Sequence, residues 1–119
     1  MKKTFTNFKM EELVLNMAPL LRQRGKLGYA AARNYRTLTD ALTEYQQFKD
    51  ELICKYGEKE ADGRFAITRD NPHRKEFMEE LKVLGEIKQA VEVYMASMNE
   101  AMQVLTGEEL LISDWMLEE

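Results

Sequence analysis

The sequence predicts an α+β fold, in which a long helix packs with two or three shorter helices and a small antiparallel sheet of two or three strands. Apolar residues recur every three or four positions over residues 27–56, as they do on one face of a helix. The turn signal Asp62-Gly63 precedes a β-favouring run at 64–68, and alternating apolar residues return at 91–95. The length of 119 residues suits a single domain, 1–119.

A short amphipathic helix is expected before the long one, because Leu13, Met17, Leu20 and Leu21 have helical spacing. Pro19 lies inside this pattern, so the helix either kinks there or begins again at that residue. The first residues open with lysines, but they lack the apolar core and the cleavage site of a secretory signal. Since no apolar run approaches the roughly 20 residues of a membrane span, a cytoplasmic protein without membrane contact is expected.

The long helix, 27–56, follows Gly25 and would extend roughly 45 Å at about 1.5 Å per residue. A compact domain of this size does not require so long a helix. Part of it is therefore expected to meet another subunit, in a homodimer built on the long helix. Gly57 is expected to close the helix in the left-handed conformation. Methionines and large aromatic residues usually fill the interior, so core packing is expected for Tyr35, Tyr45, Phe48 and Tyr56.

A second helix is expected after Asn71-Pro72, which supplies a cap and then a proline at the first helical position. It would end near Gln89, and its buried face would comprise Phe77, Leu81, Leu84 and Ile87.

The stretch 90–105 fits two secondary structures. Val91, Val93 and Met95 alternate as in a strand, and pairing with the run 64–68 would give a sheet. The same stretch also has helical spacing, at Val91, Met95, Met98, Met102 and Leu105. The strand is the favoured interpretation, and the helix stays open.

A capping box predicts the last short helix. Thr106 is followed three residues later by Glu109, so each can bond to the backbone of the other. This helix is expected to pack through Trp115.

Charge divides the chain unevenly along its length. Residues 1–36 carry eight lysines and arginines against two glutamates, a net charge of +6, whereas 37–119 carry nine basic and nineteen acidic residues, a net charge of −10. Such a division favours anions at one surface and cations or basic partners at another.

Few residues suit catalysis or metal binding. The single histidine, His73, adjoins Arg74 and Lys75 and would be a poor base, and the lone Cys54 is expected to be a partly buried, inert thiol. One cysteine and one histidine do not make a zinc site. The acidic positions Glu58, Glu60 and Asp62 lack the rest of a calcium loop, and no glycine-rich phosphate loop is present. We therefore expect no catalytic residues, no metal and no cofactor.

A basic segment next to the long helix is the candidate site. Guanidinium groups bind phosphate in bidentate fashion and tyrosine offers a stacking surface, so an anionic small molecule such as a nucleotide is the expected ligand. A long polyanion such as duplex nucleic acid is disfavoured, because the acidic remainder would repel it. The same residues also fit a solvated basic face that pairs with the acidic half, within one chain or across a dimer. The candidate ligand-binding residues are Arg22, Arg24, Lys26, Tyr29, Arg33 and Arg36.

Five segments, in order and spacing, resemble a family of small proteins of tailed phages and prophages of Gram-positive bacteria whose function is unknown. They are KLGYAAARNYRTL, KYGEKEADG, FMEEL, VEVYMASM and TGEELLISDWMLEE. The resemblance covers most of the chain and implies an α+β fold and a phage origin, without an established activity.

Phage origin and the basic segment together suggest a function. The first hypothesis is a non-enzymatic accessory protein in the host cytoplasm that sequesters a host factor, such as a nucleotide immune signal, and so counters bacterial defence. The alternative is a protein-protein module, either an acidic inhibitor of a host nucleic-acid-binding enzyme or a minor component of virion assembly.

Overall fold

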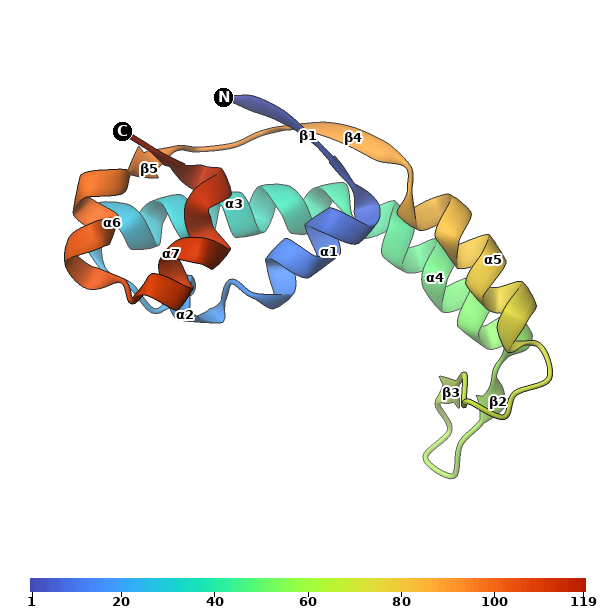
Figure 1. The fold of residues 1–119 in the computed structure, drawn as a ribbon. Helices are drawn as coiled ribbons and strands as arrows, with labels where there is room; N and C mark the ends of the chain where they lie inside the picture. Colours follow the sequence, from blue (N-terminus) through green and yellow to red (C-terminus); the bar gives the residue numbers. More distant parts are fainter.

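The computed structural model describes residues 1–119 and has an α+β fold, as the sequence predicts. The molecule is elongated, with extents of 50 × 29 × 21 Å. A body, residues 1–42 and 88–119, carries a projecting arm, residues 43–87 (Figure 1). The helices are α1 (Asn7–Leu15), α2 (Ala18–Leu21), α3 (Gly25–Ala41), α4 (Thr43–Tyr56), α5 (Arg74–Gly85), α6 (Met98–Val104) and α7 (Gly107–Ser113). One 3-10 turn, Asp114–Met116, follows α7.

The structure has three two-stranded sheets, of which one is a local hairpin and two join parts of the chain that are further apart in sequence. In the body, β1 (Lys2–Thr6) pairs antiparallel with β4 (Lys88–Glu92), Lys2 opposite Glu92 and Thr6 opposite Lys88. At the arm's tip, β2 (Glu58–Lys59) pairs antiparallel with β3 (Phe65–Ala66). Near the C-terminus, β5 (Ala96–Ser97) pairs in parallel with β6 (Leu117–Glu118).

The ambiguous stretch 90–105 contains both predicted structures in succession. Its beginning belongs to β4, and α6 begins at Met98, where Ser97 accepts a hydrogen bond from the backbone of Glu100. The predicted pairing with 64–68 is wrong, because β4 pairs with the N-terminal strand β1. Long-range packing fixes β1, since the ring of its residue Phe5 meets the ring of Trp115 edge to face, with 6.1 Å between the ring centroids.

The predicted long helix is two helices joined by a bend at Leu42 (Figure 1). Near this bend, two threonine hydroxyls form hydrogen bonds with backbone carbonyls one turn earlier. The hydroxyl of Thr39 donates to the carbonyl of Tyr35, and the hydroxyl of Thr43 donates to the carbonyl of Thr39. Such bonds compete with the regular helical pattern and often bend a helix. The packing also changes there, because α3 lies on the body and α4 lies on α5.

The ends of the arm helices differ from the prediction. Gly57 is extended (φ −81°, ψ 170°) and not left-handed, so α4 leads directly into β2. A Cβ there would lie 2.4 Å from the carbonyl oxygen of Ile53, which explains the glycine. The predicted turn is confirmed at Gly63, whose φ is +88°.

Helix α5 begins two residues later than Pro72 and ends four residues before Gln89. The side chain of Asn71 accepts a hydrogen bond from the backbone of His73 and donates one to the carbonyl of Tyr56, so it ties α4 to the start of α5. Since the helix ends at Gly85, Ile87 lies beyond it and is half exposed, contrary to the prediction.

The N-terminal helix breaks and begins again, which decides between the two alternatives at Pro19. Helix α1 ends at Leu15, and α2 begins with the proline in its first turn. The capping box of Thr106 and Glu109 is confirmed in α7, with both reciprocal hydrogen bonds present. Trp115 is buried as expected.

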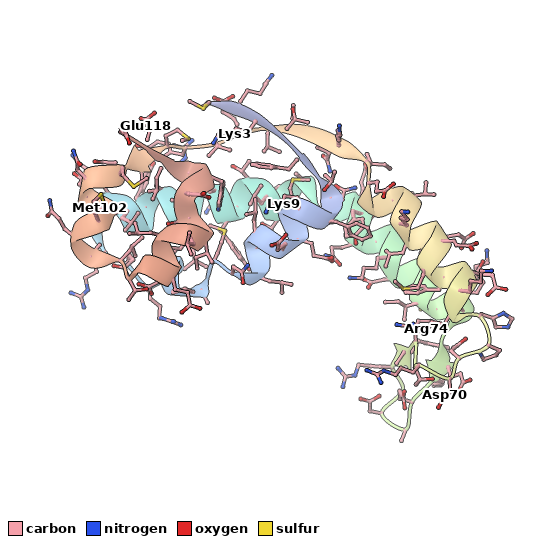
Figure 2. The ribbon with its side chains drawn as sticks, viewed as in Figure 1. Lys3, Lys9, Asp70, Arg74, Met102 and Glu118 are labelled. Atoms are coloured by element: carbon pink, nitrogen blue, oxygen red, sulfur yellow. The ribbon has the colours of Figure 1, made fainter.

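The core lies in the body, around α3. Its fully buried large side chains include Met10, Met17, Leu20, Leu38 and Met116. The prediction of core packing is confirmed for Tyr45, but it is wrong for Tyr35 and Phe48, which are 39% and 51% exposed. Tyr35 projects into solvent from α3, and Phe48 projects from α4 beside a hollow that Leu84 and Ile87 also line. Met102 on α6 is likewise exposed (Figure 2).

Candidate functional site

The candidate basic segment enters helix α3 through a tight loop. Gly25, with φ +67°, begins the helix, and Gly28 lies directly against the preceding loop. A Cβ at Gly28 would stand 2.0 Å from the backbone oxygen of Gln23, so only glycine lets this loop pack on the helix. The loop thereby holds Arg22 and Arg24 at the start of α3.

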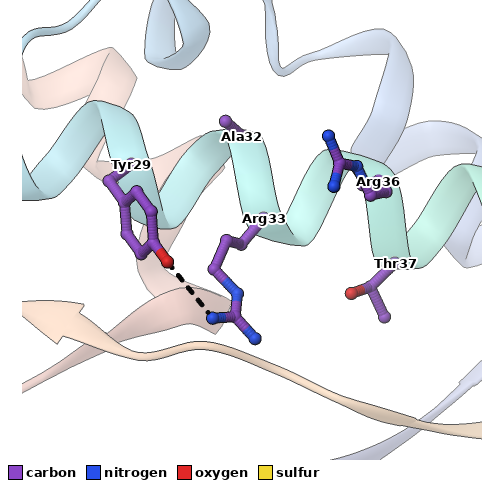
Figure 3. A pocket seen from close by; sticks show the side chains of 5 residues that line it. All are labelled: Tyr29, Ala32, Arg33, Arg36 and Thr37. Atoms are coloured by element: carbon purple, nitrogen blue, oxygen red, sulfur yellow. Dashed lines mark hydrogen bonds between the residues drawn. The ribbon is translucent and has the colours of Figure 1, made fainter.

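Arg33 is the centre of a small cluster on the outer face of α3. Its Nη1 donates to the hydroxyl of Tyr29 at 3.3 Å (Figure 3). Its guanidinium carbon lies 5.0 Å from the ring centroid of Tyr94, and the two tyrosine rings meet edge to face at 5.5 Å. The hydrogen bond with Tyr29 is the main cause that raises the pKa of Arg33 above its usual value. Arg33 therefore carries a fixed positive charge in an aromatic setting.

Asn34 positions the aromatic residue that comes from the distant part of the chain. This side chain is almost fully buried, donates to the backbone carbonyl of Tyr94 at 2.9 Å and accepts from its N–H at 2.8 Å. The two bonds fix the extended segment between β4 and β5 against α3. Tyr94 is thus held beside Arg33, although 61 residues separate them in the sequence.

Three shallow hollows meet around this cluster. One of about 340 Å³ runs along α3 between Tyr29 and Thr37. A second of about 520 Å³ lies between Lys26 and Tyr94, and a third of about 400 Å³ lies between Arg33 and Tyr94. Because neighbouring hollows share these residues, they form one groove beside α3, which we call the Arg33 groove.

The structure brings only some of the predicted ligand-binding residues together. Lys26, Tyr29, Arg33 and Arg36 line the Arg33 groove, although the side chain of Arg36 points away from that of Arg33 (Figure 3). Arg22 and Arg24 line none of the three hollows that make up the groove. The predicted convergence of six side chains is therefore wrong: four of them, Lys26, Tyr29, Arg33 and Arg36, contribute to the groove, and the other two, Arg22 and Arg24, lie on the adjoining loop.

The groove's arginines have no carboxylate partners. Lys26 lies 4.0 Å from Glu100, whereas none of the seven ion pairs in the structure involves Arg33 or Arg36. Charge is nevertheless balanced over the body, because residues 1–42 carry eight basic and three acidic residues, and 88–119 carry one basic and seven acidic residues. The groove itself has a mixed lining, because Glu92, Glu100 and Glu118 border it together with Lys26, Arg33 and Arg36. The positive charge is concentrated on the side formed by α3.

Two contributors to the groove, Asn34 and Tyr94, were not identified from the sequence. Nothing in the local pattern marks them, because Asn34 lies within a regular helix and Tyr94 within a segment of uncertain structure. The pairing of β1 with β4 and the hydrogen bonds of Asn34 together bring the segment after β4 across α3.

The remaining candidate groups lie in the arm. Cys54 is exposed, contrary to the prediction, because α4 is covered on one side only. His73 is exposed, with its ring 6.0 Å from that of Tyr56. In the acidic turn, Nη2 of Arg64 lies 2.8 Å from Oδ2 of Asp62. The hydrogen bonds from Arg64 lower the pKa of the Asp62 carboxyl. No three potential metal-ligating side chains come together, and no helix has the length and apolar character needed to cross a membrane.

Comparison with protein-family models, with curated proteins and with solved structures finds no match to this chain.

Proposed function

We propose that this chain is a non-enzymatic phage accessory protein that binds an anionic, nucleotide-like signal in the host cytoplasm and thereby counters bacterial defence. The observation that carries the proposal is Arg33, a guanidinium without a carboxylate partner, held between two tyrosines in an open groove. The phage origin is supported by the family resemblance of the five sequence segments.

The chemistry of the groove suits a ligand with both a phosphate and a base. Arg33 and Arg36 offer donors for phosphate oxygens, and guanidinium groups bind such oxygens in bidentate fashion. Tyr29 and Tyr94 are 55% and 43% exposed, so their rings are available for stacking on a nucleobase. Lys26 adds a positive charge at one end of the groove. An anion without a base would use the arginines but not the rings.

Titration calorimetry against a panel of cyclic and linear nucleotides tests the proposal. We expect heat with at least one nucleotide and a loss of affinity of about tenfold or more in Arg33→Ala, since a hydrogen bond to a charged group contributes roughly 1.5–3 kcal/mol. The matched control is the double variant R22A/R24A, which removes positive charge from the adjoining loop and leaves the groove intact.

The control variant separates specific binding from general attraction. We expect R22A/R24A to weaken binding less than Arg33→Ala, because exposed charges outside the site are screened by salt. An equal loss in the two variants would indicate non-specific attraction of anions. No heat with any nucleotide, together with unchanged thermal melting, would remove the proposal of a small ligand.

A protein-protein module is the second candidate, and the outer face of α5 supports it. Met78 and Val83 of this helix are 46% and 68% exposed, and Glu76, Glu79 and Glu80 lie on the same helix. A pull-down from host lysate would support this candidate if binding were lost on neutralising the glutamates and kept on replacing the arginines of α3. The glutamates are Glu76, Glu79, Glu80 and Glu86.

A further inference from the structure

The outer face of α3 and α4 carries opposite charges in its two halves. The basic half consists of Lys26, Tyr29, Arg33 and Arg36, and the acidic half consists of Asp40, Glu44, Phe48 and Glu51. We call this face the outer stripe. All eight side chains are exposed, and successive members are three or four residues apart, so they lie along one side of the helices.

The acidic half is as free of partners as the arginines. None of its three carboxylates takes part in an ion pair within the molecule. Phe48 is 51% exposed and borders a hollow of about 670 Å³, beside Asp40 and Glu44. An exposed large aromatic residue flanked by unpaired carboxylates is a surface suited to a partner with aromatic and cationic groups.

Three of the four residues in each half of the stripe have a counterpart in the other half. Counted outward from the point between residues 38 and 39, Arg33 stands as far on one side as Glu44 on the other. In the same way Tyr29 corresponds to Phe48, and Lys26 corresponds to Glu51. Arg36 corresponds to Ala41, the neighbour of Asp40. A cation therefore mirrors an anion at two positions and an aromatic residue mirrors an aromatic residue at one, whereas Arg36 and Asp40 mirror the uncharged Ala41 and Thr37.

We propose that a second copy of this chain docks antiparallel on the outer stripe, related by a two-fold axis that passes between residues 38 and 39. In an antiparallel pair, each residue meets the one at the mirrored position, so Arg33 of each copy meets Glu44 of the other. This axis passes through α3 close to the bend at Leu42, so residues 25–34 of each copy lie along residues 43–52 of the other. The interface is then the same patch on both copies, as in most dimers.

Charge also selects the orientation of the dimer. A parallel arrangement would place Arg33 against Arg33 and Glu44 against Glu44, and such like-charge contacts are costly. The antiparallel arrangement replaces them with attractive pairs, and it covers Tyr29 and Phe48, which are otherwise half exposed. The long-helix dimer predicted from the sequence thereby gains a register and a direction.

This inference does not rest on the proposed function, although both use Arg33 and Arg36. An anionic ligand and the carboxylates of a second copy would compete for the same guanidinium groups. Nucleotide binding is therefore expected to weaken the dimer.

Complementary charge variants test the interface. R33E/R36E makes all four charged positions in the middle of the outer stripe (33, 36, 40 and 44) acidic, and D40R/E44R makes all four basic. In sedimentation equilibrium we expect the wild type to dimerise, with a dissociation constant that rises roughly tenfold between low and high salt because the charges are screened. Each variant alone should be monomeric. An equimolar mixture of the two should form a heterodimer, since the acidic stripe then faces the basic one.

The outcomes are decisive in both directions. Recovery of a dimer on mixing would support the proposal and show that both variants are folded. A monomeric wild type over a wide concentration range, dimeric single variants or a monomeric mixture of variants with native circular dichroism would overturn it. Calorimetry with nucleotides on D40R/E44R, which keeps the arginines, tests ligand binding separately, so failure of the dimer and failure of the proposed function are distinguishable.

Discussion

Helices α3 and α4 are similar in length but differ sharply in burial. Helix α3 has 17 residues and buries Leu27, Ala30, Ala31, Asn34 and Leu38, whereas α4 has 14 residues and buries only Tyr45. The body surrounds α3 with α1, α2 and the segment from β4 to β5, while the arm offers α4 mainly α5. A helix buries its apolar face only where other elements cover it. We infer that the body supplies most of the stability and that the arm opens at a lower free energy.

A polar joint connects the arm to the body. Glu11 of α1 accepts hydrogen bonds from Tyr45, Gln46 and Lys49 of α4, the last at 2.9 Å. Beside this joint, the ring of Phe8 packs edge to face on Tyr45 at 6.4 Å. The arm is thus attached by one cluster of side chains as well as by the chain itself.

The largest effect is expected from a cavity in the body. Leu38→Ala should lower the free energy of unfolding by about 3 kcal/mol, because Leu38 is 1% exposed and its neighbours cannot fill the space. Leu52→Ala in the half-buried face of α4 should cost about 1 kcal/mol. Urea denaturation measures both. Equal losses in the two variants would contradict the difference between body and arm.

A smaller effect is expected where the arm meets the body. A Cβ at Gly85 would lie 2.2 Å from the ring of Phe8, so Gly85→Ala must displace that ring from Tyr45. We expect a loss of about 1–2 kcal/mol, as for other overpacked sites. Gly107→Ala is the matched control, because nothing lies within 4 Å of its Cβ position. Thermal melting measures the effect. If both variants had the melting temperature of the wild type, the ring of Phe8 could move without cost and the prediction would be wrong.

The smallest effect is a pH dependence of the joint. Burial, followed by the charge of Glu11, raises the pKa of Tyr45 from 10.0 to about 12. The folded state therefore keeps this proton between pH 10 and about 12, while the unfolded chain loses it, so the free energy of unfolding falls as pH rises through that range. Tyr45→Phe lacks the titrating group. Its free energy of unfolding, measured by urea titration, should therefore fall less between pH 9 and 11.5 than that of the wild type. An identical decline in Tyr45→Phe and wild type would refute the assignment.

Local chemistry predicted some elements of the fold well. The turn at Gly63 and the capping box of α7 each depend on neighbouring residues, and both occur where the sequence places them. The bend at Leu42 was not predicted, since the apolar spacing continues through it while the packing partner changes from the body to α5. The true partner of β4 was also missed, because a register between β1 and β4 spans nearly the whole chain.

The candidate site was predicted in part for the same reason. Helical spacing alone predicts Tyr29, Arg33 and Arg36 on one side of α3, and all three line the groove, although the side chain of Arg36 points away from that of Arg33. Spacing cannot say whether Arg22 and Arg24, on a loop, reach the same groove, and they line none of its hollows.

The sequence by itself determined the class of the fold, the turn at Gly63, the capping box of α7 and the basic residues along α3, because each follows from residues a few positions apart. Tertiary structure alone decided where that segment bends, which strand pairs with β4 and that Tyr94 stands beside Arg33. These features depend on contacts between residues far apart in the chain. Such contacts form only when the chain buries its apolar faces together, and no local pattern records which of them is chosen.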